Sequence, residues 1–224
     1  MEGNYPPFTQ TEADGSVTGF EIDLAKDLCR RMRARCDLVK TDFAQLLPKL
    51  NNGELDAVIA SLTITEKRQK EVDFSNSYHH IPSAWIAAAG TVTAVLPGGM
   101  QGKVVTVLKG SPREAWVQSN YGEMRIAPVA KEVELYAKLV DKTADVALSS
   151  LLVAKTKFLN LPEGKNFGVV GSSIWLGDGV GVAVKKGNSE LRNRFNQAIS
   201  KSVDSGDYKK MAFRYFDFNL RERM

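Results

Sequence analysis

The sequence contains no apolar run that approaches the roughly 18 residues needed to span a membrane as a helix. It has no phosphate-binding glycine loop and no Ser-His-Asp order typical of a hydrolase. Its two histidines and two cysteines lie in different segments, which argues against a zinc site. The 30 lysines and arginines are dispersed and give a net charge of +4, whereas nucleic-acid binding requires a clustered basic patch. These absences disfavour metalloproteins, nucleic-acid binders and the common enzyme motifs.

The composition fits an ordinary globular protein. The chain has 224 residues, of which 43% are hydrophobic and 25% charged, enough for one large or two small domains. Amphipathic helical patterns alternate with short apolar runs typical of buried strands. We expect strands at 37–40, 57–60, 83–89, 103–108, 145–148, 167–170 and 177–184, and helices at 22–32, 43–50, 114–120, 133–140, 191–203 and 208–216. This alternation predicts an α/β fold.

One stretch, DAVIASLTITEKRQKEVDFS at 56–75, combines the features of an anion site. A buried strand at its start leads to Ser61 and Thr63, which bring two hydroxyls and backbone N–H groups. Thr65 is a suitable N-cap for a short helix, and Arg68 falls in the first turn of that helix. Because a guanidinium offers a planar fork to two oxygens and a helix start adds N–H donors, the stretch predicts a carboxylate site. The alternative is a solvated arginine on a surface helix.

The same stretch resembles the ligand-binding segment of the polar amino acid family of bacterial solute-binding proteins, particularly the lysine/arginine/ornithine and histidine binders. Further motifs follow in the family's order over nearly the whole chain: YPPF at 5–8, GFEIDLAKDLCRRM at 19–32, DFAQLLPKL at 42–50, LKGS at 108–111, GDGVGVAV at 177–184 and YKKMAFRYFDFN at 208–219. The resemblance is highly specific for the family and much less specific for a ligand.

The resemblance implies a two-lobed α/β fold of the type II periplasmic binding protein kind, in which each lobe is a mixed sheet flanked by helices. We expect a discontinuous first lobe at 1–85 and 180–224 and a second lobe at 86–179. The turn-rich segment 90–100 and the glycine-rich segment 177–184 are the predicted crossings between lobes. Ligand pockets form preferentially between domains, so hinge closure around a small molecule is the expected motion.

The resemblance also implies the roles of individual residues. In the family, the arginine matching Arg68 and the backbone N–H matching Thr63 bind the α-carboxylate of the ligand. A carbonyl and a hydroxyl matching Ser61 and Thr63 bind the α-ammonium, and aromatics matching Tyr5 and Phe43 enclose the ligand side chain. Simple core packing is the alternative for both aromatics. The full set of implied ligand-binding positions is Glu2, Tyr5, Phe43, Ser61, Leu62, Thr63, Arg68, Leu108, Ser111, Pro112 and Ser150.

The second lobe departs from the family pattern at two of these positions. Pro112 stands where a threonine usually donates its N–H to the carboxylate, and proline has no N–H. Ser150 stands where an acidic residue usually pairs with the α-ammonium, so the charge is lost. Lys109, Arg113 and Trp175 lie near in sequence and could recruit another group, although surface or packing roles are the simpler interpretation.

Composition leaves the state of the two cysteines undecided, but the resemblance implies a Cys29–Cys36 disulfide and hence an oxidising compartment. We therefore expect a periplasmic protein, although no signal peptide is recognisable in this sequence. The family also has a strand before the position of Glu2, where only Met1 stands here. A cut chain, a misassigned start and a differently completed sheet are the open explanations. An open strand position in the first lobe predicts self-association or low stability.

We therefore expect an extracytoplasmic receptor of an ABC importer that binds an amino acid or an amino-acid-like carboxylate, basic or opine-like. The expected partners are that small molecule and the transporter permease, with no cofactor and no metal. The alternatives are a cyclohexadienyl-type dehydratase on the same fold and a degenerate or sensory protein that does not transport. A dehydratase would need a general acid, for which Glu2 at the rim is the only obvious candidate. We expect His79 and His80, adjacent on a strand, at the surface or a lobe interface.

Overall fold

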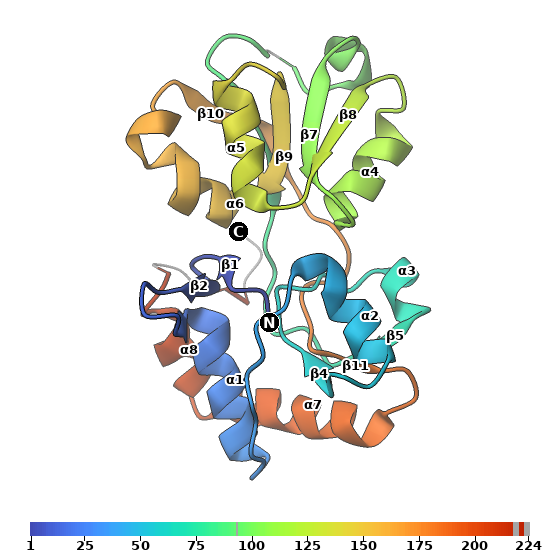
Figure 1. Cartoon of the computed structure of the whole chain (residues 1–224), viewed down its shortest axis with the longest axis vertical. Coiled ribbons are helices and arrows are strands. Elements are labelled where there is room, and N and C mark those ends of the chain that lie inside the picture. The colour runs from blue at the N-terminus through green and yellow to red at the C-terminus, as the bar shows by residue number, and fades with distance from the viewer. Residues whose placement is uncertain (93, 217–219, 222–224) are drawn as a thin grey trace. The chain divides into compact units, whose positions relative to one another are not determined.

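The computed structural model of the chain describes residues 1–92, 94–216 and 220–221. It divides the chain into two compact units (Figure 1): unit 1 is Met1–His80 with Gly177–Met224, and unit 2 is Ile81–Leu176. The predicted lobes, 1–85 with 180–224 and 86–179, have their boundaries a few residues away from these. No helix among the described residues is long and apolar enough to cross a membrane.

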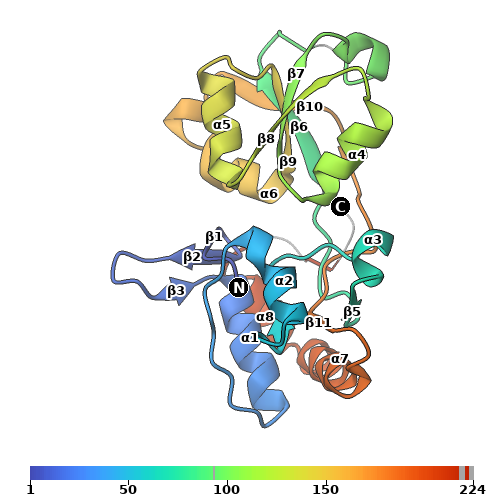
Figure 2. The ribbon, with the colours of Figure 1, turned by 45° about the vertical axis from the view of Figure 1, so that its right-hand side comes forward.

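Unit 1 holds two three-stranded sheets, with strand orders β1-β2-β3 and β4-β11-β5. All their pairings are antiparallel. The strands are β1 (Asn4–Tyr5), β2 (Thr9–Thr11), β3 (Val17–Thr18), β4 (Ala57–Val58), β5 (Val72–Phe74) and β11 (Ala183–Lys185). The helices are α1 (Phe20–Arg31), η1 (Phe43–Gln45), α2 (Leu46–Asn51), α3 (Glu66–Gln69), α7 (Ser189–Asp204) and α8 (Asp207–Ala212). Figure 2 shows the small sheet β1-β2-β3 beside the start of α1.

One core cluster of unit 1 joins α2 to the sheet β4-β11-β5. Leu46 and Leu50 of α2 are fully buried against Val58, Val72 and Ala183. This packing fixes the position of β4 relative to α2. It therefore also fixes the point from which the segment after β4 begins. The last predicted helix, 208–216, is shorter in the structure, since α8 ends at Ala212. The end of the motif quoted for that region, 217–219, lies outside the described residues.

The strand predicted at 37–40 is absent from the structure. The described backbone there has no regular secondary structure, and Leu38 and Val39 remain 40% and 49% exposed. Met1 makes two backbone hydrogen bonds beside it: its amino group donates to Val39 O at 2.9 Å, and its carbonyl accepts from Thr41 N at 2.9 Å. Two such bonds do not make a ladder, so the apolar pattern of this segment is not enough to form a strand.

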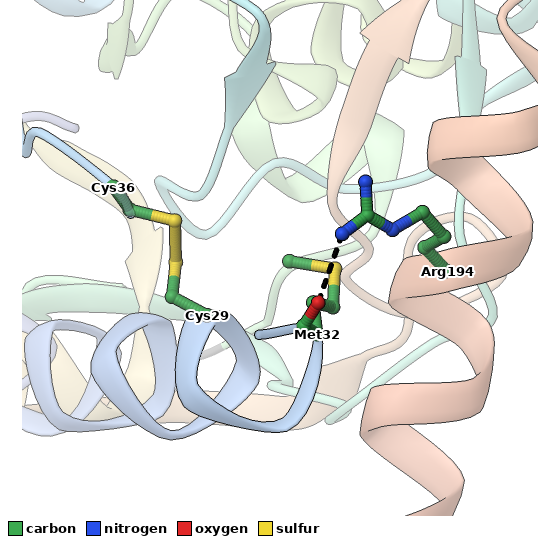
Figure 3. Close-up of a disulfide and its surroundings, with 4 residues drawn as sticks. All are labelled: Cys29, Met32, Cys36 and Arg194. Atoms are coloured by element: carbon green, nitrogen blue, oxygen red, sulfur yellow. Dashed lines mark hydrogen bonds between the residues drawn. A yellow bond between two sulfur atoms is a disulfide. The ribbon is translucent and has the colours of Figure 1, made fainter. Parts of the chain in front are cut away.

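A disulfide joins Cys29 in the last turn of α1 to Cys36 beyond it, as the sequence predicts (Figure 3). Near this point the Arg194 guanidinium of α7 donates to the Met32 carbonyl at 2.9 Å. Asp27 also joins α1 to α7, because its Oδ2 accepts from Ser202 Oγ at 2.6 Å. These contacts fix the C-terminal end of α1 within unit 1.

Unit 2 is built on one five-stranded sheet in the order β10-β6-β9-β7-β8. β7 runs parallel to β8 and β9, whereas β6 runs antiparallel to β9 and β10. The strands are β6 (Ser83–Ala88), β7 (Val104–Leu108), β8 (Arg125–Val129), β9 (Val146–Ser150) and β10 (Phe167–Ile174). The helices are η2 (Pro97–Met100), α4 (Pro112–Asn120), α5 (Glu132–Val140), α6 (Leu151–Ala154), the π-helix η3 (Lys155–Leu159) and η4 (Pro162–Gly164).

Alternation along β6 explains the two cores of unit 2. Trp85 belongs to a buried cluster that includes Val117 of α4, and the next residue, Ile86, belongs to a second cluster that includes Leu135 of α5. Successive strand residues point to opposite faces, so the sheet has a helix-covered core on each face (Figure 1). Because all of β6 pairs within this sheet, the segment 90–100 lies inside unit 2 and is not the crossing that the sequence predicts.

Candidate functional site

The segment after β4 is held by the returning chain before β11. Leu62 is 1% exposed and packs in the core cluster of α2, so only its backbone is available to a ligand. Ile64 N donates to Gly179 O at 2.8 Å, and Ile64 O accepts from Asp178 N at 3.0 Å. Gly177 permits this approach, because it has φ +66° and a Cβ there would meet Ile64 O at 2.2 Å. The backbone around Thr63 is thereby fixed on both sides.

Thr65 begins α3 as predicted, with its hydroxyl accepting from Arg68 N at 3.3 Å. Arg68 is only 8% exposed, which excludes the alternative of a solvated surface arginine. Its NH1 donates to Thr63 O at 3.0 Å, and its guanidinium carbon lies 5.8 Å from the centre of the half-buried Phe43 ring. A cation over an aromatic face is attractive. The structure therefore brings Thr63, Arg68 and Phe43 together on one side of unit 1.

Ser61 has an unusual backbone and a buried partner. Its φ of +47° lies in the left-handed region, which is costly for a residue with a Cβ. Glu21 Oε1 accepts from Ser61 N at 2.8 Å and from Ser61 Oγ at 3.0 Å. The Tyr78 hydroxyl donates to the same oxygen at 2.5 Å. Glu21 itself is fully buried in the first turn of α1.

His79 is fully buried beside this network, contrary to the prediction of a surface or interface position. Its ring stacks on Phe8 at 5.2 Å and meets the Tyr78 ring edge-on at 4.7 Å, so a hydrophobic environment encloses it. Its Nε2 is 3.7 Å from Glu21 Oε1. Burial lowers the pKa of His79, although the Glu21 charge opposes that shift, so the imidazole is neutral. Burial and the Glu21 charge raise the pKa of Tyr78 well above its ordinary value, which keeps its hydroxyl protonated.

Of the two remaining candidates in unit 1, Tyr5 is 7% exposed on β1 and its ring stacks on Phe8 with centroids 5.8 Å apart. Glu2 is half-buried just before β1. The packing of Tyr5 on Phe8 favours the core-packing interpretation for at least one face of that ring.

In unit 2, Leu108 ends β7, and Ser111 caps α4 by accepting from Glu114 N at 3.3 Å. Pro112 occupies the first helical position, where a missing N–H costs the helix nothing. The Glu114 carboxylate accepts from Gly110 N at 2.7 Å. The start of α4 thus lacks the N–H of its first residue, and the Glu114 carboxylate lies beside it.

Ser150 ends β9, which runs parallel to β7, so Ser150 and Leu108 stand at the same edge of the sheet. Ser150 is 1% exposed, and its hydroxyl has no hydrogen-bond partner among the described residues. Its N–H donates to Glu132 Oε1 at 3.3 Å. The same oxygen accepts from Ser149 Oγ at 2.7 Å, and Glu132 Oε2 lies 3.5 Å from an Arg113 nitrogen.

Sequence reasoning missed the two buried carboxylates that organise these segments, Glu21 and Glu132. A signal existed for Glu21, since it shares a helical face with Ala25 and Leu28, four and seven residues further along α1. An acidic residue on a buried face requires partners, and these partners are 40 or more residues away in sequence. Glu132 has no comparable signal, because it opens α5 as an ordinary first-turn acid. The described residues contain no group of three or more His, Cys, Asp or Glu that could hold a metal ion.

The two α/β units, joined by two chain crossings, with an arginine-bearing segment after a short strand, define a periplasmic binding-protein-like protein. The model of bacterial extracellular solute-binding proteins, family 3, matches residues 1–218, and the chain belongs to that family. It is 38% identical over 222 residues to the lysine/arginine/ornithine-binding periplasmic protein of Escherichia coli K12, covering 96% of this chain and 85% of that protein.

Two further relatives support the same assignment. The histidine-binding periplasmic protein of Salmonella typhimurium is 32% identical over 222 residues, covering 96% of this chain and 85% of that protein. The crystal structure of a periplasmic His/Glu/Gln/Arg/opine family-binding protein from Silicibacter pomeroyi, in complex with lysine, superposes with a TM-score of 0.88 at 25% identity, covering 99% of this chain and 97% of that one. These relatives are binding proteins, which confirms the predicted fold and favours a binding protein over an enzyme.

Proposed function

We propose that this protein is the extracytoplasmic receptor of an ABC importer and binds an amino-acid-like carboxylate. The observation that carries the proposal is the buried Arg68, held by Thr63 O beneath the Phe43 ring in unit 1. A buried guanidinium requires an anionic or strongly polar environment, and a planar carboxylate matches its fork. The proposed roles are carboxylate binding by Arg68 and the Thr63 N–H, amine binding by Ser61 and Thr63, and stacking by Tyr5 and Phe43.

In unit 2, Leu108, Ser111, Pro112 and Ser150 are the proposed closing residues. None of these four residues carries a negative charge that could pair with a free α-ammonium. Glu132 is close to Ser150, but its carboxylate is engaged by Ser149, the Ser150 N–H and Arg113. Its negative charge is therefore already balanced and gives an ammonium little extra stabilisation.

The preferred ligand is accordingly a carboxylate whose α-amine is substituted or absent, as in an opine, rather than free lysine, arginine or histidine. Arg113, directly after Pro112, is 12% exposed and lies 3.5 Å from Glu132, so its charge is balanced in the same way.

The importer role rests on the family and on relatives named as periplasmic binding proteins. The Cys29–Cys36 disulfide supports an oxidising, periplasmic location. The proposed partners are the ligand and a transporter permease. Glu2 lies before β1 and would reach a basic side chain of the ligand, a binding role rather than that of a general acid.

Isothermal titration calorimetry with a ligand panel tests the proposal. The panel contains lysine, arginine, histidine, their Nα-carboxyalkyl (opine) derivatives and their desamino analogues. We expect tight binding of at least one opine or desamino carboxylate and weak or no binding of the free basic amino acids. The absence of binding to every member would reject the receptor function, and turnover of a cyclohexadienyl acid would favour the dehydratase alternative.

A further inference from the structure

The buried Glu21 carboxylate is hydrogen-bonded to the hydroxyl of Ser61, a proposed ligand-binding residue 40 positions away in sequence. A serine hydroxyl has one donor and two acceptor lone pairs. The Ser61 hydroxyl lies 3.0 Å from Glu21 Oε1, an oxygen that also accepts from Ser61 N and the Tyr78 hydroxyl, so the single Ser61 hydrogen points at Glu21. What Ser61 has left to offer a ligand is a lone pair, which suits an N–H donor and repels a carboxylate.

The same oxygen holds the Ser61 backbone. Glu21 Oε1 accepts from Ser61 N at 2.8 Å, in a residue whose φ of +47° is costly without external support. Bonds to a charged acceptor are about twice as strong as neutral ones. One carboxylate therefore sets both the position of Ser61 and the direction of its hydroxyl.

Glu21 is itself rigidly placed. It sits in the first turn of α1, where the helix dipole favours negative charge. The Tyr78 hydroxyl donates to it, and the backbone carbonyl of Tyr78 in turn accepts from Tyr208 OH at 2.6 Å. The neighbouring His79 ring is neutral in this apolar environment and supplies no cation to balance the carboxylate.

We propose that Glu21 is the positioning residue of the amine subsite: it fixes the Ser61 hydroxyl as a hydrogen-bond acceptor, so that a ligand with an N–H-bearing amine, such as the secondary amine of an opine, binds more tightly than its own desamino analogue. The inference rests on the proposed function, because it assigns Ser61 to the ligand amine. Glu21 has no contact with the ligand in this scheme and acts only through Ser61.

The test compares each ligand with its desamino analogue. The parent, Glu21→Met, Glu21→Gln and the matched control Asp23→Asn, in the same turn of α1, are titrated calorimetrically with the panel member that binds tightest and carries an amine. Each is also titrated with the analogue that lacks the amine. We expect Glu21→Met to reduce the affinity ratio of amine to desamino ligand by about tenfold, with a smaller loss for Glu21→Gln, which keeps an oxygen acceptor. Asp23→Asn should leave the ratio unchanged, since Asp23 bonds to Tyr215 and Arg214 instead.

A purely structural role would lower both affinities equally and leave the ratio unchanged, which would overturn the proposal. If Glu21→Met does not fold, Glu21→Gln in a Ser61→Ala background replaces it. In the Ser61→Ala background, Glu21→Gln should no longer change the affinity ratio of amine to desamino ligand. A change in that ratio that persists in this background would refute action through Ser61.

A ligand-free measurement separates this inference from the proposed function. Hydrogen exchange should show the Ser61 amide protected in the parent and at least tenfold less protected in Glu21→Gln or Glu21→Met, with the Val58 amide of β4 unchanged. Equal protection in parent and variants would overturn the inference. A parent that binds nothing in the panel while this protection pattern holds would reject the proposed function alone.

Discussion

Adding two polar groups to unit 2 should increase the affinity of the protein for free basic amino acids. The changes are Ser150→Asp, which supplies a negative charge for an α-ammonium, and Pro112→Thr, which supplies an N–H for an α-carboxylate. Pro112 occupies the first helical position, whose N–H has no partner inside the helix, so a threonine N–H there would be available without rebuilding α4.

The expected magnitude follows from the contacts. A neutral hydrogen bond contributes about 0.5–1.5 kcal/mol and one to a charged group about 1.5–3 kcal/mol. Ser150→Asp should therefore gain about 1.4 kcal/mol for an ammonium, which is about tenfold in affinity. Glu132 reduces this gain, because its Oε1 is 3.3 Å from Ser150 N and a second carboxylate would lie close to it. Arg113, 3.5 Å from the other Glu132 oxygen, offsets part of that repulsion.

Calorimetry with arginine and lysine provides the measurement, and Ser150→Asn is the matched control, since it adds a polar side chain without charge. We expect affinity for arginine and lysine to increase from the parent to Ser150→Asn and from Ser150→Asn to Ser150→Asp. Adding Pro112→Thr to Ser150→Asp should increase that affinity about another tenfold. A Glu132→Gln background should enlarge the Ser150→Asp gain. Submicromolar binding of free arginine or lysine by the parent, or a double variant that binds them no better, would refute the reasoning.

Four further predictions concern unit 1. Arg68→Lys should weaken any carboxylate ligand at least about tenfold in calorimetry through loss of the planar fork, and unchanged affinity would place the carboxylate elsewhere. Thiol titration of the oxidised, unfolded protein should find no free Cys29 or Cys36, and reduction should cost a few kcal/mol at most, about the lower half of the range for native disulfides. The exposed segment at 37–40 should pair with another chain, so Val39→Lys should reduce self-association in sedimentation. A parent that is a monodisperse monomer would contradict that expectation. Burial tends to raise the pKa of Asp27, but hydrogen bonds from Arg31 and Ser202 hold that pKa below its ordinary value. The contribution of Asp27 to folding stability is therefore present above the unfolded pKa and is lost on acidification. Asp27→Asn should therefore flatten the fall in melting temperature below about pH 5.

Local chemistry explains what the sequence could predict. Thr65 caps α3 and Arg68 follows in its first turn, because capping depends on residues three positions apart. The long amphipathic pattern at 191–203 likewise lies within α7, whereas the Cys29–Cys36 bond follows from the family resemblance and not from local spacing. The hydrophobic periodicity of a single helix or strand can therefore be recognised from one sequence without an alignment.

Long-range partners explain what it could not predict. Glu21 meets Ser61 and Tyr78 across 40 and 57 residues, and no local pattern connects them. His79 looks polar in sequence but lies among aromatic rings contributed by other elements. The segment at 37–40 looks like a strand in sequence, yet a strand needs a neighbour that its own residues do not specify.

The two halves of the proposed site differ in the groups they leave for a ligand. In unit 1 the Ser61 donors are committed to Glu21, so this subsite offers an acceptor to an amine, while the buried Arg68 offers charged donors to a carboxylate. In unit 2 the start of α4 has no N–H at Pro112, and the Glu114 carboxylate already accepts from the preceding loop. Docking on unit 1 would then use features that every amino acid shares. We therefore predict that selectivity among carboxylates depends on the unit 2 residues Pro112 and Ser150.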